Sequence, residues 1–454
     1  MSVFLVLVLT GLMRALASFD ADEKTSAGVS LALGYLLLCA YFIGGLFKRV
    51  GLPKLTGYIA TGVLVGPSLL GLVTGSMLES TRIVNGVAVA LIALTAGSEL
   101  EYRAMRPLFR SIREISAYGV LGTAFLLACA VYLARGLLPF MQALSQVEAM
   151  AMSMVLGVVM VAQSPAVVVA LRDEMEAEGP LASTVLGVVV IADLVVILLF
   201  ALSSSLAKAV LGGGLDMLQT GRTLAWELLG SLVAGAVIGY LLGLYLRKVA
   251  GGAALFVLLI AFIIAEVGQR LHFDPLLVAL AAGMFVRNLT QVGDELHRHI
   301  QAPALPVYIL FFAGAGANLH LDVLWVVGLP AVLFVLVRAG GLLAGAAIGA
   351  RIAEAPPVVR RYAGFGLLPQ AGLALALSLL FAKTFPEFGA EAGALTLGVV
   401  AINEMVAPAV YRLALVRSGE AYRKRAEPSP AAPTTPLPAT PLPATHPSAR
   451  APEA

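Results

Sequence analysis

The sequence predicts an all-α protein that crosses a membrane many times. Three observations support this: the composition, the spacing of apolar segments and the placing of basic residues in the loops. Of the 454 residues, 59% are hydrophobic and only 13% are charged. Soluble domains contain about 45–50% apolar and about 25% charged residues, so this chain has too little polar surface to cover itself in water. The net charge of +3 is small and gives no reason to expect nucleic acid as a partner.

Thirteen segments are apolar enough to form membrane helices. A hydrocarbon layer about 30 Å thick requires about 20 apolar residues in a helix, so the shorter segments are expected to tilt or to span only part of the layer. The segments lie near residues 28–47, 57–76, 83–98, 115–137, 149–170, 181–205, 224–246, 253–268, 274–287, 303–317, 324–349, 363–382 and 391–415.

Two terminal segments flank the expected membrane domain of residues 28–415. Residues 1–27 form an N-terminal apolar segment, in which Met1–Ser18 is either an additional helix or a cleaved leader. Residues 416–454 are rich in Pro and Ala, which is typical of a disordered tail. The two cysteines and five histidines are scattered, so we expect no disulfide framework, no metal centre and no cofactor.

Basic residues predict the orientation of the helices. One alternating set of loops carries 15 basic residues and the opposite set carries 7. Because basic loops stay on the cytoplasmic side, the first set is expected inside, together with the C-terminus. The first set is Lys48, Arg49, Lys54, Arg103, Arg106, Arg110, Arg113, Arg172, Arg247, Lys248, Arg287, Arg298, Arg351, Arg360 and Arg361, and the second is Lys24, Arg82, Arg135, Lys208, Arg222, Arg270 and Lys383.

A short pattern occurs twice and ends each time in a carboxylate inside an apolar helix. Residues 186–193 read LGVVVIAD and residues 397–404 read LGVVAINE, with five of the eight positions identical. Chance similarity is the alternative, because the chain is rich in Leu, Gly and Val. The helix before each copy is interrupted by a proline with polar neighbours, which makes chance a weaker explanation.

The interruptions are Gln163-Ser164-Pro165 in segment 149–170 and Pro369-Gln370 in segment 363–382. Proline removes a backbone donor and clashes with the carbonyl one turn earlier, and freed carbonyls at membrane depth are tolerated only where they line a cavity or meet protein partners. Corresponding broken helices in two halves mark the central site of a transporter. The two segments are predicted to run in opposite directions, so the repeats are expected to be inverted. The alternative is that each proline merely kinks its helix.

Asp193 is the strongest candidate for an ion-binding group. Its neighbours one turn away are apolar, and no basic residue lies within a turn of it. A charge at mid-bilayer costs at least about 2.5–3.5 kcal/mol, so an intramembrane carboxylate is a functional candidate by default. Because desolvation disfavours the charged form, one such site can accept either a proton or a small cation. A carboxylate neutralised by a structural partner is the alternative.

Four further charges lie in or at the end of the apolar segments: Arg338, Glu404, Glu266 and Glu99. Arg338 stays protonated and is expected to pair with an acid, for which Glu404 is favoured over Asp193. A structural ion pair and a role in the transport cycle remain equally open for Arg338. Glu266 is expected to be a structural hydrogen-bonding residue.

Several motifs occur in an order that resembles the sodium/hydrogen exchanger domain of the monovalent cation:proton antiporter-2 family. The resemblance covers roughly residues 28–415. Each motif alone is weak, but the ordered set is specific. The motifs are Gly57-Tyr58-Ile59-Ala60-Thr61-Gly62 with Gly66-Pro67-Ser68, Gly97-Ser98-Glu99-Leu100, Ser164-Pro165-Ala166, Asp193, Ala265-Glu266 with Gly268, Ala282-Gly283, Phe311-Phe312-Ala313-Gly314 and Arg338.

The resemblance implies thirteen helices, a domain that forms a homodimer, and a core domain where two broken helices cross beside an ion-binding aspartate. Asp193 falls on that aspartate, Ser164 and its neighbours on the first broken helix, and Arg338 where the family has Lys or Arg. One departure is Ala192, which stands where the family usually has Asp, Asn or Gln. The missing polar neighbour leads us to expect one-for-one, electroneutral exchange.

We therefore expect a secondary active transporter, not an enzyme, that exchanges Na⁺ or K⁺ for H⁺ across the inner (cell) membrane. Gln163 and Ser164 are expected to bind the ion together with Asp193. The alternative within transport is a sodium- or proton-coupled symporter of an organic anion.

Overall fold

The structure, a computed structural model, describes residues 6, 10–11, 27–80, 82–211, 217–249, 252–271, 273–318, 321–370 and 372–422. The question of an extra helix or a leader at Met1–Ser18 falls outside these residues, apart from residues 6, 10 and 11. The predicted disorder of the tail lies outside them from residue 423 onward.

Helices make up almost all of the described chain, and no strand occurs in it. Each of the thirteen predicted segments overlaps at least one helix. The helices are α2 (Ala27–Arg49), α3 (Lys54–Val65), α4 (Gly75–Ser80), α5 (Arg82–Glu99), α6 (Tyr102–Met105), η1 (Arg106–Leu108), α7 (Phe109–Ile115), η2 (Ser116–Leu121), α8 (Gly122–Leu133), η3 (Ala134–Leu137), α9 (Pro139–Gln142), α10 (Gln146–Val161), α11 (Pro165–Glu174), α12 (Pro180–Val210), α13 (Met217–Lys248), α14 (Ala253–Leu271), α15 (Pro275–Leu289), α16 (Gly293–Ala317), α17 (Leu321–Ile352), α18 (Pro357–Gly366), α19 (Gly372–Thr384) and α20 (Pro386–Ser418).

Within the described residues, six helices are long and apolar enough to cross a membrane. A bent pair inside α16, Gly293–Ile300 and Leu305–Ala317, meets at 59° and raises this number to seven if it forms one span. Five shorter apolar helices accompany them: Lys54–Val65, Ile83–Glu99, Ala253–Glu266, Pro275–Leu289 and Leu373–Ala382. The chain is therefore a multi-pass membrane protein, and the number of thirteen spans stays a prediction.

One predicted segment, 57–76, is shorter as a helix than expected. Helix α3 ends at Val65, and Gly66 adopts an extended conformation with φ −69° and ψ 178°. Pro67 follows, and the residue before a proline is pushed away from helical angles. The Gly66-Pro67 pair therefore stops the helix although the apolar pattern continues.

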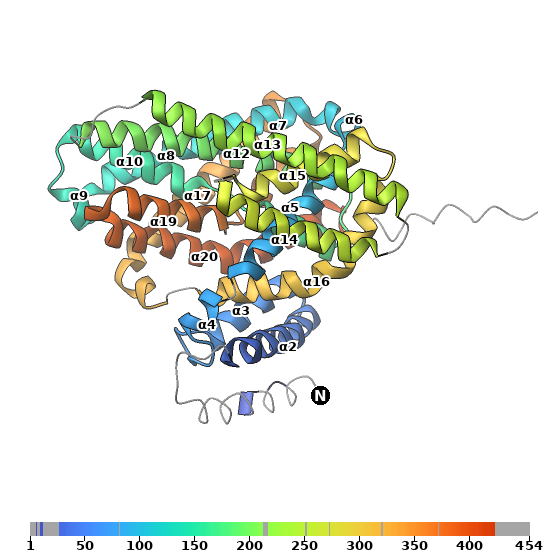
Figure 1. Cartoon of the computed structure of the whole chain (residues 1–454). Helices are drawn as coiled ribbons and strands as arrows, with labels where there is room; N and C mark the ends of the chain where they lie inside the picture. Colours follow the sequence, from blue (N-terminus) through green and yellow to red (C-terminus); the bar gives the residue numbers. More distant parts are fainter. Residues whose placement is uncertain are drawn as a thin grey trace, which may run out of the picture.

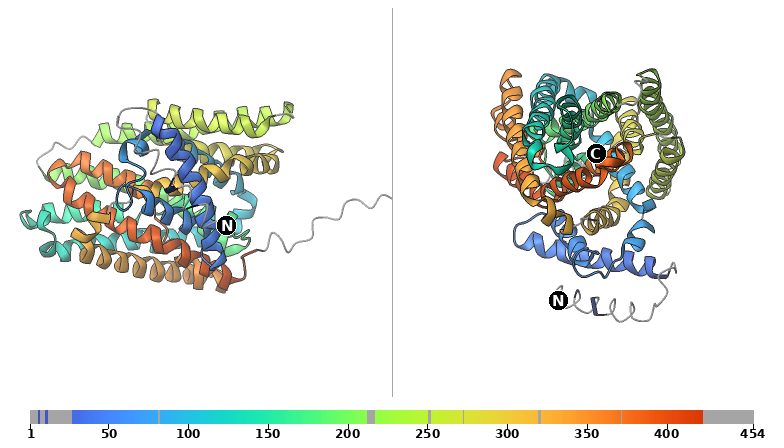
Figure 2. Two further views of the ribbon diagram at one scale, coloured as in Figure 1. Left: turned by 90° about the horizontal axis from the view of Figure 1, so that it is seen from below. Right: turned by 90° about the vertical axis from the view of Figure 1, so that its left-hand side faces the viewer.

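The helices pack mainly within two groups, which touch each other at few places. In the right-hand view of Figure 2 many helices are seen nearly end-on, with the teal and the orange to red helices to one side of the yellow ones. We call the first set the core group, which contains α7, η2, α8, α10, α11, α12, α17, α18, α19 and α20. We call the second the panel group, which contains α2, α3, α5, α13, α14, α15 and α16 (Figure 1).

The panel group is held together by close backbone contact between α5 and α15. A Cβ atom added at Gly97 would lie 2.2 Å from the carbonyl oxygen of Leu280, and one added at Gly283 would lie 2.5 Å from that of Leu94. Small residues allow membrane helices to approach in this way. The contact fixes α5 and α15 side by side, and both helices contribute to the site described below.

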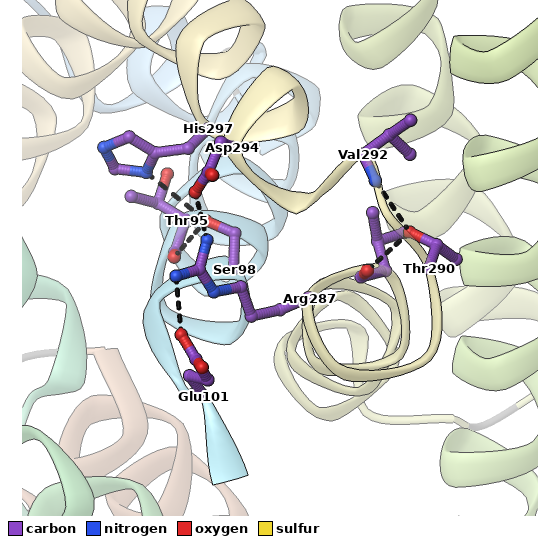
Figure 3. Close-up of polar contacts among 9 residues, drawn as sticks. Thr95, Ser98, Glu101, Arg287, Thr290, Val292, Asp294 and His297 are labelled. Atoms are coloured by element: carbon purple, nitrogen blue, oxygen red, sulfur yellow. Dashed lines mark hydrogen bonds and ion pairs between the residues drawn. The ribbon is translucent and has the colours of Figure 1, made fainter. Parts of the chain in front are cut away.

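Polar contacts fasten the ends of α5, α15 and α16 to one another (Figure 3). Arg287 on α15 donates to Glu101, at 2.7 Å, and forms an ion pair with Asp294 on α16. Ser98 on α5 lies 3.4 Å from Nδ1 of His297 on α16. These contacts lie at the end that the basic residues assign to the cytoplasm.

We expect Gly97→Ala and Gly283→Ala to destabilise the protein, because each new methyl group must push two backbones apart. Overpacking of this kind costs about 1–3 kcal/mol. The measurement is the apparent melting temperature of the purified protein in detergent. Gly340→Ala on α17 is the matched control, because a Cβ there meets nothing within 4 Å. Melting temperatures equal to that of Gly340→Ala would contradict the close contact.

Candidate ion-binding site

The first helix break separates α10 from α11 in the core group. Helix α10 ends at Val161, and α11 begins at Pro165, where the missing N–H is one that would find no partner in the helix. The Ser164 hydroxyl caps α11 by accepting a hydrogen bond from the Val167 N–H, at 3.3 Å. The sequence Gln163-Ser164-Pro165 thus ends one helix and starts another.

The second break separates α18 from α19 and touches the first. Helix α18 ends at Gly366 and α19 begins at Gly372, with Pro369 and Gln370 between them. The Ser164 N–H donates to the Pro369 carbonyl at 3.0 Å. The structure therefore brings the two sequence-predicted interruptions together, backbone to backbone.

Arg338 on α17 satisfies the carbonyls that the breaks set free. Its guanidinium is fully buried and donates from Nε to Met160, at 2.9 Å, from Nη1 to Leu368, at 2.7 Å, and from Nη2 to Ala162, at 3.0 Å. These carbonyls lie at the C-terminal ends of the two half-helices, where the helix dipole leaves partial negative charge. The Arg338 guanidinium thus stabilises both breaks.

The predicted ion pair between Arg338 and Glu404 is wrong. All three hydrogen bonds that the guanidinium makes in the described chain go to carbonyls, and neither carboxylate oxygen of Glu404 has a hydrogen-bond partner there. From the sequence we expected the charge of Arg338 to pair with a carboxylate. Three freed backbone carbonyls are equally good hydrogen-bond acceptors for a planar guanidinium. Glu404 is fully buried in α20, so it lies inside the protein without a basic partner.

Gln370 adds a second polar link between the breaks. Its Nε2 donates to the Met160 carbonyl at 3.0 Å, and its Oε1 accepts from Nδ2 of Asn403 at 3.1 Å. Asn403 is the residue next to Glu404 in the repeated pattern, and we did not select it from the sequence. The sequence did contain an indication of this role, because the carboxamide of Asn403 lies in an apolar helix and needs hydrogen-bond partners there.

Asp193 lies on α12 beside the crossing. Its side chain is 4% exposed and its Oδ1 has no hydrogen-bond partner within the described residues. Gln163 is fully buried, and neither its Oε1 nor its Nε2 has a partner in the same part of the chain. Buried polar atoms are nearly always hydrogen-bonded, so these atoms are available to a ligand.

Asp193 and Gln163 line one cavity of about 350 Å³ between the core and panel groups. Pro165, the first residue of α11, and Leu373, the second residue of α19, line it as well, so the N-terminal ends of two helices, which carry partial positive charge, border the cavity. The described lining residues include no Lys, Arg or His; they are Asn85, Gly86, Val89, Ile92, Ala93, Ala96, Gln163, Ser164, Pro165, Ala166, Val190, Asp193, Leu194, Ile197, Asp274, Pro275, Leu276, Leu277, Leu280, Phe311, Leu373 and Ala376.

The remaining predicted charges lie away from this cavity. Glu266 on α14 has a side chain that is 54% exposed and forms an ion pair with Arg270 at 2.7 Å. Glu99, at the end of α5, forms a buried ion pair with Arg172 on α11. Neither glutamate lines the cavity.

The Glu99–Arg172 ion pair joins the two groups just beyond the cavity. Cavity-lining residues follow one face of α5 from Asn85 to Ala96, and Glu99 comes one turn later. Next to it, the Glu174 carboxylate accepts from the Lys54 N–H, at 2.7 Å, at the start of α3. These polar contacts between the groups gather at the end predicted to be cytoplasmic.

Fold and site together are of the kind found in secondary transporters, in which broken helices meet at a central binding site. The chain belongs to the family described as "Sodium/hydrogen exchanger, transmembrane", whose model matches residues 3–416. The family predicted from the sequence motifs is thereby confirmed.

The chain is also similar to individual proteins of related sequence or structure. The chain is 25% identical over 362 residues to the Na(+)/H(+)-K(+) antiporter GerN of Bacillus cereus, covering 76% of this chain and 86% of GerN. It is 26% identical over 296 residues to the iron transporter MagA of Paramagnetospirillum magneticum, covering 63% of each chain. The structure of the sodium proton antiporter MjNhaP1 from Methanocaldococcus jannaschii has the same fold, with a TM-score of 0.64 at 14% identity over 86% of this chain and 98% of the other.

We expect Arg338→Met to lower the melting temperature strongly or to prevent accumulation of the protein. Each buried carbonyl left without a donor costs about 1–3 kcal/mol. The Leu368 and Ala162 carbonyls lose their side-chain donor, whereas Met160 keeps the hydrogen bond from Gln370. Arg338→Lys should be intermediate, because an ammonium keeps the charge without the planar fork. The control is Arg351→Met, which removes an exposed arginine of the same helix. Equal stability of the Arg338→Met and Arg351→Met variants would show that Arg338 does not hold the breaks.

Proposed function

We propose that this protein is a secondary antiporter that exchanges Na⁺ or K⁺ for H⁺, with Asp193 as the group that binds either ion. The observation that supports it is a buried carboxylate, unpartnered at Oδ1, in a cavity beside two broken helices. A site that holds one ion at a time couples the two fluxes, because each ion must leave before the other binds. Membership of the exchanger family supports the same reaction.

The ligand atoms suit a hard monovalent cation. Oxygen atoms of carboxylates and amides are the preferred ligands of such ions, and the Asp193 Oδ1 and Gln163 Oε1 atoms are free for this purpose. Iron prefers sites with several His, Cys or carboxylate ligands. Within the described residues no group of three or more His, Cys, Asp or Glu could hold a metal ion. An alkali cation is therefore the better candidate cargo.

The same cavity argues against the alternative, a symporter of an organic anion. An organic anion would meet two carboxylates in this cavity, and the described lining residues include no basic side chain to offset their repulsion. Arg338 cannot serve, because its three nitrogens are all engaged with carbonyls. The electrostatics of the cavity favour a cation.

We further propose thirteen spans, inverted repeats and a cytoplasmic C-terminus in the inner membrane, together with a homodimer. Crossed breaks in corresponding helices support the repeats, and the contrast of basic loops supports the orientation. The sparse contacts between the core and panel groups support alternating access by movement of one group against the other.

We expect Asp193→Asn to abolish exchange while the protein still accumulates, because the amide cannot take up a proton and carries no charge for a cation. The measurement is the response of a pH-sensitive dye in everted vesicles to added Na⁺, K⁺ or Li⁺. Asp294→Asn, which changes an exposed aspartate outside the cavity, is the matched control and should keep the response. A persisting response in Asp193→Asn would remove this residue from the mechanism.

We also expect one-for-one exchange. Arg338 is committed to carbonyls and Ala192 carries no charge, so the ion changes the charge of a single core-group carboxylate at the cavity. In proteoliposomes the rate should not respond to an imposed membrane potential set with K⁺ and valinomycin, provided that Na⁺ is the transported cation. A rate that follows the potential, or transport that generates one, would contradict this stoichiometry.

A further inference from the structure

A second carboxylate, Asp274, lies in the cavity opposite Asp193. It precedes α15 in the panel group, where its Oδ1 accepts from the Leu277 N–H at 3.0 Å and its own N–H donates to the Ser231 hydroxyl of α13 at 3.0 Å. We did not select it from the sequence, because it lies at the first position of the predicted segment 274–287. An acidic residue at the end of a membrane segment is typical of a loop.

Among the described side chains, Asp274 has no basic partner. None of the ion pairs between them includes it, and the described residues that line its cavity include no Lys, Arg or His. A charge in a largely apolar cavity is costly unless an opposite charge offsets it. The cap of α15 accounts for the position of one carboxylate oxygen, Oδ1. It does not account for the negative charge, because Asn and Ser cap helices equally well.

A second feature of the same cavity points to a bound ion. Gln163 is fully buried and its carboxamide has no partner within the described chain, and Asp193 Oδ1 is likewise free. These atoms come from the core group, whereas Asp274 and Asn85 come from the panel group. The polar groups of the cavity thus face each other across the boundary between the two groups.

We propose that Asp274 is a second ligand for the transported cation, and that it acts on one side of the membrane only. The proposal rests on the exchange reaction and the alternating access inferred above. When the core group carries Asp193 to the other side, Asp274 stays behind with the panel group. A cation entering the cavity of the present state meets two carboxylates, and on the opposite side it meets one.

The side is set by the predicted orientation. Arg270, just before Asp274, belongs to the sparsely charged outer loops, and the polar contacts around Glu99 and Arg172 lie at the opposite end. Asp274 therefore faces the outer side, and it raises the affinity of the outward-facing site for the cation.

The test compares Asp274→Asn with the unaltered protein in right-side-out and in everted vesicles. The quantity measured is the Na⁺ concentration that gives a half-maximal dye response. We expect it to rise on one face only, the outer one, by roughly fivefold or more, the size expected for loss of one partly buried charge interaction. No rise on either face, or an equal rise on both, would overturn the proposal.

Control variants distinguish the effect of losing the Asp274 charge from the effect of a folding defect. Asp274→Asn and Asp274→Ser both keep a cap for α15, so their melting temperatures without Na⁺ should match that of the unaltered protein, while the rise in melting temperature on adding Na⁺ should be smaller. Should Asp274→Asn accumulate poorly, Asp274→Ser supplies the same comparison. Asp294→Asn removes an exposed carboxylate of the panel group and should change neither quantity. An undiminished Na⁺-induced rise in both Asp274 variants would also overturn the proposal.

Exchange by the Asp193→Asn variant, measured in parallel, distinguishes failure of the proposed exchange site from failure of the proposed role of Asp274. If exchange persists without the Asp193 carboxylate, the proposed exchange site is wrong. If exchange is lost in Asp193→Asn but Asp274→Asn behaves like the unaltered protein on both faces, only the role of Asp274 is wrong.

Discussion

The fold depends on how carbonyl groups freed inside a membrane are satisfied. Broken helices expose backbone acceptors where no water compensates them, and here one buried guanidinium on α17 bonds to carbonyls from both breaks. Because Arg338 is occupied in this way, it does not pair with Asp193, and no described basic residue does so. The same interaction therefore stabilises both breaks and leaves the Asp193 carboxylate available for the ion binding proposed above.

Much of this arrangement could be predicted from local sequence. Proline with polar neighbours marked both breaks, and the isolation of Asp193 among apolar residues marked the site. The partner of Arg338 could not be predicted, because carbonyl acceptors leave no trace in the side-chain sequence. Asp274 could not be predicted as a site residue for a different reason. Its position opposite Asp193 depends on the packing of α15 against α5, which brings residues that are far apart in the chain to one cavity.

At the proposed ion site, Gln163 supplies the polar group that Ala192 lacks. A polar residue beside the aspartate would lie on α12, but Gln163 brings an amide to the same cavity from the first break. The backbone contact between Ser164 and Pro369 joins this break to the second one. The geometry of the proposed ligands then depends on the contact between the two breaks rather than on neighbours along one helix.

In the transport cycle proposed above, the ion pair between Glu99 and Arg172 affects the step in which the two groups separate. Both side chains are nearly buried, at 6% and 11% exposed, and they join the two groups beyond the cavity. A buried ion pair gains little net stability, since desolvation offsets much of its attraction. When the groups separate, both charges become hydrated again, so a contact made by this ion pair opens at a lower free-energy cost than an apolar contact of equal area. We therefore expect the ion pair to hold the groups together in the present state without making their separation slow.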